Sequence, residues 1–113
     1  MIQGFLHGFA VTPASAQVLD TMAAVAPCTI RMVLAVAASS GASPTVLDVL
    51  LNGTSVWSAA GSRPTLAATK SGRFISGHIN RAAVQDGDVL QLVVASAGGA
   101  GQLAATVALE DPR

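Results

Sequence analysis

The residues that could perform acid–base or nucleophilic chemistry are few in this 113-residue chain, and they are scattered along it. His78, with Asp48 or Asp86 and one of several serines, supplies the residue types of a Ser-His-Asp triad. No serine lies in a Gly-x-Ser-x-Gly nucleophile elbow, since Ser71 and Ser76 lack the preceding glycine. We therefore expect no catalytic residues and a protein that is not an enzyme.

The potential metal and phosphate ligands do not form a site in the sequence. Cys28 is the only cysteine, and with His7 and His78 it gives too few clustered ligands for zinc. Residues 86–88 (Asp-Gly-Asp) lack the further acidic positions of a calcium loop, so we interpret them as a turn stabilised by the first aspartate. Residues 98–101 lack the Gly-Lys-Ser/Thr ending of a phosphate loop, and we interpret them as a hairpin between the last two strands. We expect no metal and no cofactor.

The one aromatic side chain with a polar edge, Trp57, allows two interpretations. It either fills the core or, with Arg63, Arg73 and His78 at an exposed edge, forms a platform on which a ligand such as a sugar stacks. Four basic residues lie between positions 63 and 81, but three Phe and one Trp in the whole chain are too few for a nucleic-acid stacking surface. We therefore expect no nucleic-acid partner.

The composition excludes several classes of protein. Hydrophobic residues make up 51% of the chain and charged residues 11%, with a formal net charge of zero. A disordered chain would be richer in charge, and a nucleic-acid binder would be basic. No apolar stretch is long enough to span a bilayer and no signal peptide is visible, so we expect no membrane partner and synthesis in a cytoplasm. So little charge on a small domain indicates a subunit of an assembly.

The apolar residues after position 26 recur with the period of two that is typical of strands. In residues 29–37 the more apolar face is the one that carries Ile30, Met32, Leu34 and Val36, and we expect it to face the core. Residues 45–51 alternate in the same way and end at Asn52-Gly53, which favours a type I′ hairpin turn. Further strands are expected at residues 64–68, 74–79, 89–95 and 103–109, with residues 89–95 buried on both faces.

These short strands at regular spacing predict an all-β fold. We expect an antiparallel β-sandwich, jelly-roll-like, of about 7–8 strands, formed by residues 26–113. Residues 1–25 are expected to be an N-terminal arm, or a first strand plus connector. Phe5, Leu6 and Phe9, separated by glycines, are the candidate assembly interface of that segment, which either docks on a neighbour or is the first strand of this sandwich. Residues 17–25 fit a short helix or a strand.

The order of these signals from residue 26 to residue 109 resembles a small β-sandwich module of tailed-phage virion proteins. The shared pattern covers about three-quarters of the chain. It consists of a proline before an extended strand (27–37), a Ser/Ala/Pro linker (39–44), a strand ending in Asn-Gly with a short return (47–57), a short strand after Arg-Pro (63–66), Asp-Gly-Asp before a Val/Leu strand (86–94), and a glycine-rich turn before the last strand (98–109). Such modules occur in bacteriophage tail-fibre tips, head fibres and capsid decoration proteins.

The resemblance implies a non-enzymatic virion structural protein. We expect a capsid decoration or head-spike/fibre subunit that is made in the host cytoplasm and located in the virion. Its expected partners are its own copies, as a symmetric trimer or pentamer, and capsid or other virion proteins. The alternative is a small carbohydrate-binding β-sandwich module that attaches to a glycan of the host surface through Trp57.

Overall fold

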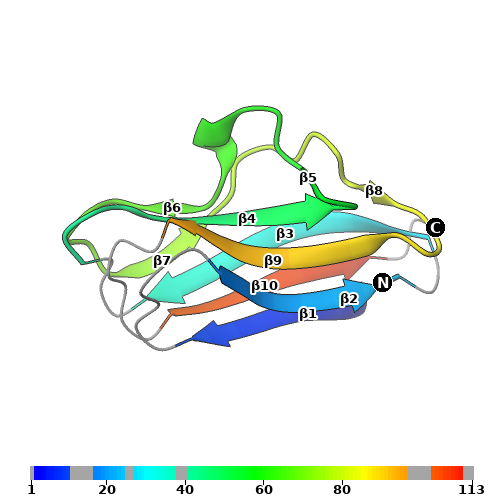
Figure 1. Ribbon diagram of the computed structural model, residues 1–113, viewed down its shortest axis with the longest axis horizontal. Helices are drawn as coiled ribbons and strands as arrows, with labels where there is room; N and C mark the ends of the chain where they lie inside the picture. The colour runs from blue at the N-terminus through cyan, green and yellow to red at the C-terminus, as the bar shows by residue number, and fades with distance from the viewer. Residues whose placement is uncertain (1, 11–16, 25–26, 38–40, 97–102, 111–113) are drawn as a thin grey trace.

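The computed structural model describes residues 2–10, 17–24, 27–37, 41–96 and 103–110, and these form two stacked antiparallel sheets (Figure 1). Sheet A has the strand order β1-β10-β3-β7, with β8 also paired to β3. Sheet B has the order β2-β9-β4-β5, with β6 also paired to β4. The bounds are β1 Ile2–Ala10, β2 Gln17–Ala23, β3 Cys28–Ala37, β4 Thr45–Leu51, β5 Thr54–Ser55, β6 Thr65–Leu66, β7 Gly72–Ile75, β8 Ala83–Val84, β9 Val89–Ser96 and β10 Leu103–Glu110, with a 3-10 turn η1 at Ala60–Ser62.

The strand order is that of a jelly roll. The first and last strands pair (β1 with β10), then the next pair inward (β2 with β9), then β3 with β7 and β8, and then β4 with β5 and β6. This long folded hairpin is wrapped so that β10 also pairs with β3, and β9 with β4. The expectation of an all-β, jelly-roll-like sandwich is therefore confirmed, and the topology is one that viral capsid and lectin domains use.

The core lies between the sheets and follows the period of two in most strands. In β4, Leu47, Val49 and Leu51 are buried, as the sequence predicts. The hairpin turn between β4 and β5 is also as predicted, because Asn52 and Gly53 both have the positive φ of a type I′ turn, at 51° and 86°. The inward residues of β9 are Leu90, Leu92 and Val94, and those of β10 are Leu103, Ala105, Val107 and Leu109.

Strand β3 departs from the expected alternation at Arg31. The register with β10 shifts between Ala108 and Leu109, so two successive residues of β3, Arg31 and Met32, are both exposed. Past this bulge the faces are exchanged, and Val33 is fully buried while Met32 and Val36 are each 48% exposed. Our assignment of Met32, Leu34 and Val36 to the core face is therefore wrong, and of that row only Ile30 faces the core.

The N-terminal residues form strands of this same sandwich. Ile2–Ala10 pairs along β10 of its own chain, so of the two arrangements left open for this segment the structure has the strand within sheet A. Gln17–Ala23 pairs with β9, where the sequence also allowed a helix. The described residues contain no α-helix, and their ten strands exceed the expected seven or eight because three are two-residue pieces.

Three further expectations about strands need correction. Strand β7 ends at Ile75, because residues 76–82 leave the sheet. In β9 only one side is fully buried, since Gln91 and Val93 on the other side are half-buried. The last two strands form no hairpin, because β9 belongs to sheet B and β10 to sheet A; residues 97–102 lie outside the described part.

Two loops close one side of the sandwich, where each sheet has an interrupted edge strand (Figure 1). Residues 56–64 connect β5 with β6, and residues 76–82 connect β7 with β8. The loops are joined by backbone hydrogen bonds, from Gly77 N to Ser62 O at 2.8 Å and from Asn80 N to Val56 O at 3.0 Å. A Cβ on Gly77 would lie 3.3 Å from the Cβ of Ser62, so glycine permits this close approach. The joined loops bury Val56 and Trp57 in the core.

Candidate assembly surface

The outer face of sheet A, on the side away from the core, carries most of the large apolar side chains that the described part leaves in solvent. Met32 and Val36 are each 48% exposed and Ile75 is 58% exposed, and all three lie on this face. Leu34 lies between them as the register partner of Ile75 and is half-buried. Exposed apolar side chains that adjoin one another on an otherwise regular sheet are typical of an interaction surface.

The relief of this face is a ridge beside a groove. The ridge is the row Met32, Leu34 and Val36 on β3, and the groove is the row of small residues on β10 that are their register partners, namely Ala108, Thr106 and Ala104. A depression of about 280 Å³ lies along this boundary and is lined by residues 34–36, Arg73, Ala104 and Thr106. A second one, of about 420 Å³, separates the ridge from β7.

Charged residues on this face lie toward its ends. At one end Arg31 Nε is 2.7 Å from Glu110 Oε2, which forms an ion pair within the chain. Toward the other end Arg73 is exposed beside Val36, its register partner. Among the side chains that the structure describes, those in the middle of the face, around Leu34 and Thr106, are uncharged.

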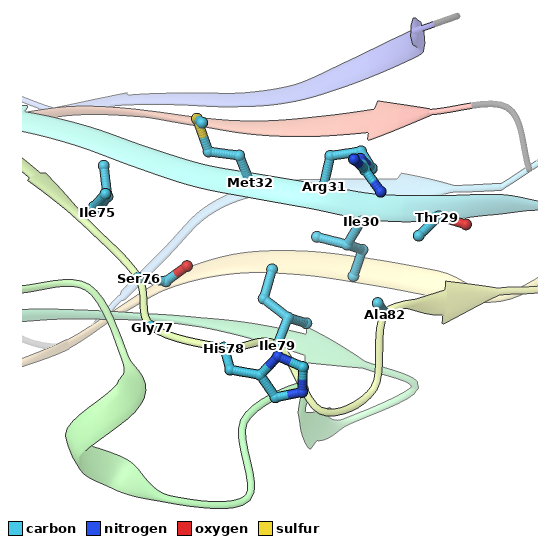
Figure 2. Close-up of a pocket in the computed structure, with 10 residues that line it drawn as sticks. All are labelled: Thr29, Ile30, Arg31, Met32, Ile75, Ser76, Gly77, His78, Ile79 and Ala82. Carbon is cyan, nitrogen blue, oxygen red and sulfur yellow. The ribbon is translucent and has the colours of Figure 1, made fainter.

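A depression of about 360 Å³ lies where residues 76–82 leave the edge of β3 (Figure 2). It is lined by residues 29–32 of β3 together with residues 75–79 and Ala82. The side chains of Ile30 and Ile79 point toward one another across it (Figure 2). His78 is exposed on the loop and is the one imidazole among these lining residues. The depression adjoins the outer face of sheet A because Met32 and Ile75 line both.

The four residues expected to form a ligand platform do not share a surface. Trp57 is only 3% exposed and belongs to the core cluster, so its indole offers no face to a sugar. Arg63 is directed to Asp48 of sheet B, whereas Arg73 lies on β7 of sheet A. His78 lies on the loop between β7 and β8. Of the two interpretations of Trp57, the structure has the one in which it fills the core.

Asp48 is the one buried carboxylate in the described part, and it is held by the neighbouring loop. Its Oδ1 accepts hydrogen bonds from the Ser55 hydroxyl at 2.7 Å and from its neighbour's amide, Val49 N, at 2.8 Å. Its Oδ2 lies 3.4 Å from Arg63 Nε, close enough for an ion pair but without hydrogen-bond geometry. These contacts satisfy the carboxylate, so the burial of Asp48 is explained by its structural role.

The Asp-Gly-Asp segment is a turn, and its second aspartate stabilises it. Asp88 Oδ2 accepts a hydrogen bond from Gln85 N at 2.8 Å, and Oδ1 accepts one from Asn52 Nδ2 at 3.0 Å. The Asn52 hydrogen bond, followed by the Gln85 amide and Arg81, lowers the pKa of Asp88 below its ordinary value. Gly87 has the positive φ expected of it, at 87°. We expected Asp86 to bind the backbone here, and the structure assigns that role to Asp88.

The remaining chemistry-bearing residues do not assemble into a site either. Among the described residues, no group of three or more His, Cys, Asp or Glu side chains could hold a metal ion. Burial, and to a lesser extent the Asp88 carboxylate, raises the pKa of the Cys28 thiol, which is 5% exposed. In the same part of the chain no helix has the length and hydrophobicity to cross a bilayer.

The predicted assembly residues of the N-terminal segment lie on β1, at the edge of sheet A. Phe5, Leu6 and Phe9 are the register partners of Ala108, Val107 and Ala104 on β10. Their side chains lie outside the described part of the structure. The backbone alone therefore places them beside the candidate surface.

The topology and the outer face of sheet A are the two features from which a function can be argued. Comparison of the chain with models of protein families, with curated proteins and with solved structures finds no match. The residues of this face were not identified as a surface from the sequence, because the bulge at Arg31 changes which side of β3 they occupy.

Proposed function

We propose that this protein is a non-enzymatic structural subunit of a phage or phage-like particle, a capsid decoration or head-spike/fibre protein that assembles with its own copies. The observation that carries the proposal is the exposed apolar outer face of sheet A, with Met32, Val36 and Ile75 about half exposed. Adjoining exposed apolar side chains of this kind favour contact with another surface, such as that of a neighbouring subunit.

Two further properties support the proposal. The jelly-roll topology is one that capsid domains use. The chain has only 11% charged residues and no net charge, and a subunit that is covered on several sides needs less charge to stay in solution.

The experiment that tests this function is mass spectrometry of particles purified from the organism that carries the gene. The protein is expected in the particle fraction in many copies, at a fixed ratio to the major shell protein. Its absence from every particle fraction, while it is present in the soluble fraction of the same cells, would contradict the proposal.

A carbohydrate-binding module is the second candidate, and it loses its main residue in this structure. A sugar platform needs an exposed aromatic face, and Trp57 is buried. A glycan site would have to use the depression beside His78, which has no described aromatic lining. We therefore keep the structural role as the conclusion.

A further inference from the structure

We infer that two copies of this chain bind face to face through the outer faces of their A sheets, related by a two-fold axis that runs along the strands between β3 and β10. This inference rests on the proposed function in one respect, the association of the chain with its own copies. It adds the surface, the symmetry and the residue pairs.

The ridge and groove fix the position of the axis. A two-fold axis that runs parallel to the strands, midway between β3 and β10, places β3 of each copy over β10 of the other. Rotation about this axis does not shift a residue along the strand direction. The register partners within one sheet then become contact partners across the interface, so that Leu34 lies over Thr106 of the second copy and Val36 over Ala104. Each large residue faces a small one, which is the self-complementarity that a two-fold contact requires.

The charges are compatible with the same axis. It brings Arg31 of one copy over the end of β10 that carries Glu110 of the other, so the two internal ion pairs form one group of alternating charge. Strand β7, with Arg73, comes to lie over β1, whose side chains are outside the described part. Among the described side chains, the contact therefore places opposite charges together.

The available area is sufficient for such a contact. Strands spaced about 4.8 Å apart, with about 3.4 Å per residue, give the four strands of sheet A a flat area of roughly 500 Å². The two copies together would bury about twice this flat area. Because side chains make the accessible surface larger than the flat one, the buried accessible area comes near the lower limit of about 1,200 Å² for specific interfaces. The contact also brings β1, where we expected the assembly residues Phe5, Leu6 and Phe9, within the interface.

The test is the mass in solution, by sedimentation equilibrium, of the native protein and of two matched variants. Val36 and Val18 are both valines on strands with nearly equal exposure, 48% and 51%, but Val18 lies on sheet B. Native protein is expected at about twice the 11.2 kDa of the chain. Val36→Glu should raise the dissociation constant about a hundredfold or more, because two carboxylates would lose water at the contact and lie over Ala104, which offers them no hydrogen bond, even with Arg73 beside position 36 in its own chain. Val18→Glu should leave the dissociation constant unchanged.

A complementary pair of variants tests the axis itself. Ala104→Lys should weaken association of the variant with itself, because each lysine would face Val36 of the other copy. Mixed with Val36→Glu, it should form a mixed dimer in which one glutamate faces one lysine and the second contact is native. Circular dichroism checks that each variant is folded, and Ile75→Glu, at a 58% exposed position, replaces Val36→Glu if that variant is not.

The outcomes that overturn the inference are distinct from those that contradict the function. A monomeric native protein, equal effects of Val36→Glu and Val18→Glu, or no association in the mixture would each overturn this contact. A multimer that is indifferent to Val36→Glu would also overturn it and would leave the structural role standing. Absence from particles would contradict the role and leave the contact standing.

Discussion

The outer face of sheet B carries Asp48 in the middle of β4, whereas the corresponding face of sheet A carries Leu34 in the middle of β3. On sheet B, Ser55 of β5 and Arg63 of the loop between β5 and β6 contact that carboxylate. On sheet A, the loop between β7 and β8 turns toward the other loop and leaves Met32 and Ile75 in solvent. The polar centre of one face is satisfied within the chain, whereas the apolar centre of the other remains partly exposed.

This difference shows that a chain with so little charge can close its core as one small sandwich and still leave one outer face apolar and exposed. Both loops contribute to closing the core, since Val56 and Trp57 are buried where they meet. Neither loop covers the outer face of sheet A. Substitutions on the two sides of each strand test which residues face the core and which face solvent.

The largest effect is expected just after the bulge of β3, where Met32 and Val33 lie on opposite sides of the sheet. Val33→Asp should cost about 4 kcal/mol or more in the free energy of unfolding, because Val33 is fully buried and the carboxylate would have no partner. Met32→Asp should change it by less than about 0.5 kcal/mol in the monomer, because Met32 is 48% exposed. Urea denaturation at low protein concentration measures both. Equal losses would show that the faces of β3 are wrongly assigned.

Strand β7 gives a second pair of neighbours. Phe74→Ala should cost about 3–4 kcal/mol, since Phe74 is 7% exposed and its removal leaves a cavity. Ile75→Ala should cost about 0.5 kcal/mol or less, because Ile75 lies on the outer face of sheet A. The same denaturation experiment compares them. A larger loss for Ile75→Ala would mean that β7 presents its other side to the core.

On sheet B, the expected effect comes from the buried carboxylate. Asp48→Ala should lower the free energy of unfolding by about 2 kcal/mol, because it leaves the Ser55 hydroxyl without its acceptor and the Arg63 guanidinium without its ion-pair partner. Asp86→Ala, at an exposed turn position, is the control and should have little effect. If both variants were equally stable, the claim that the polar centre of sheet B is satisfied within the chain would fail.

The smallest effect concerns pH and the turn that joins β8 to β9. The pKa of Asp88 is lowered in the folded protein, so its contribution is present above the ordinary value of 3.8 and is lost as pH falls through the folded value. Between pH 6 and pH 3 the thermal midpoint of native protein should fall more than that of Asp88→Ala. A parallel fall in the two proteins would mean that the Asn52 and Gln85 hydrogen bonds do not stabilise the turn.

The fold could be predicted from the sequence because local chemistry determines most of it. Asn52-Gly53 fixes the hairpin, and the alternation of Leu47, Val49 and Leu51 identifies one face of β4. The bulge at Arg31 could not be predicted, since it inserts a residue without any glycine or proline to mark it. A single inserted residue then exchanges the faces of the rest of the strand.

The extra residue Arg31 in β3 also prevents the candidate surface from being predicted from the sequence. A row of Met32, Leu34 and Val36 is indistinguishable in sequence from a core row, and the smaller apolar residues Val33, Ala35 and Ala37 take the core positions instead. The burial of Trp57 was also open in the sequence, because it depends on two loops that meet only in the folded chain. Asp48 carried a usable signal, since a charged residue within an apolar strand marks an outward position.

The central claim, that copies meet through sheet A and not through sheet B, is tested most directly by one distance between copies. A spin label at position 18, in Val18→Cys combined with Cys28→Ala, reports that distance by pulsed electron paramagnetic resonance. With layers about 10 Å apart, contact through the A sheets predicts about 30 Å or more between the two labelled positions. A distance of about 10 Å, the spacing of one layer, would contradict the account. So would the absence of a dipolar signal at a protein concentration of about 100 μM, because a typical micromolar contact would be populated at that concentration.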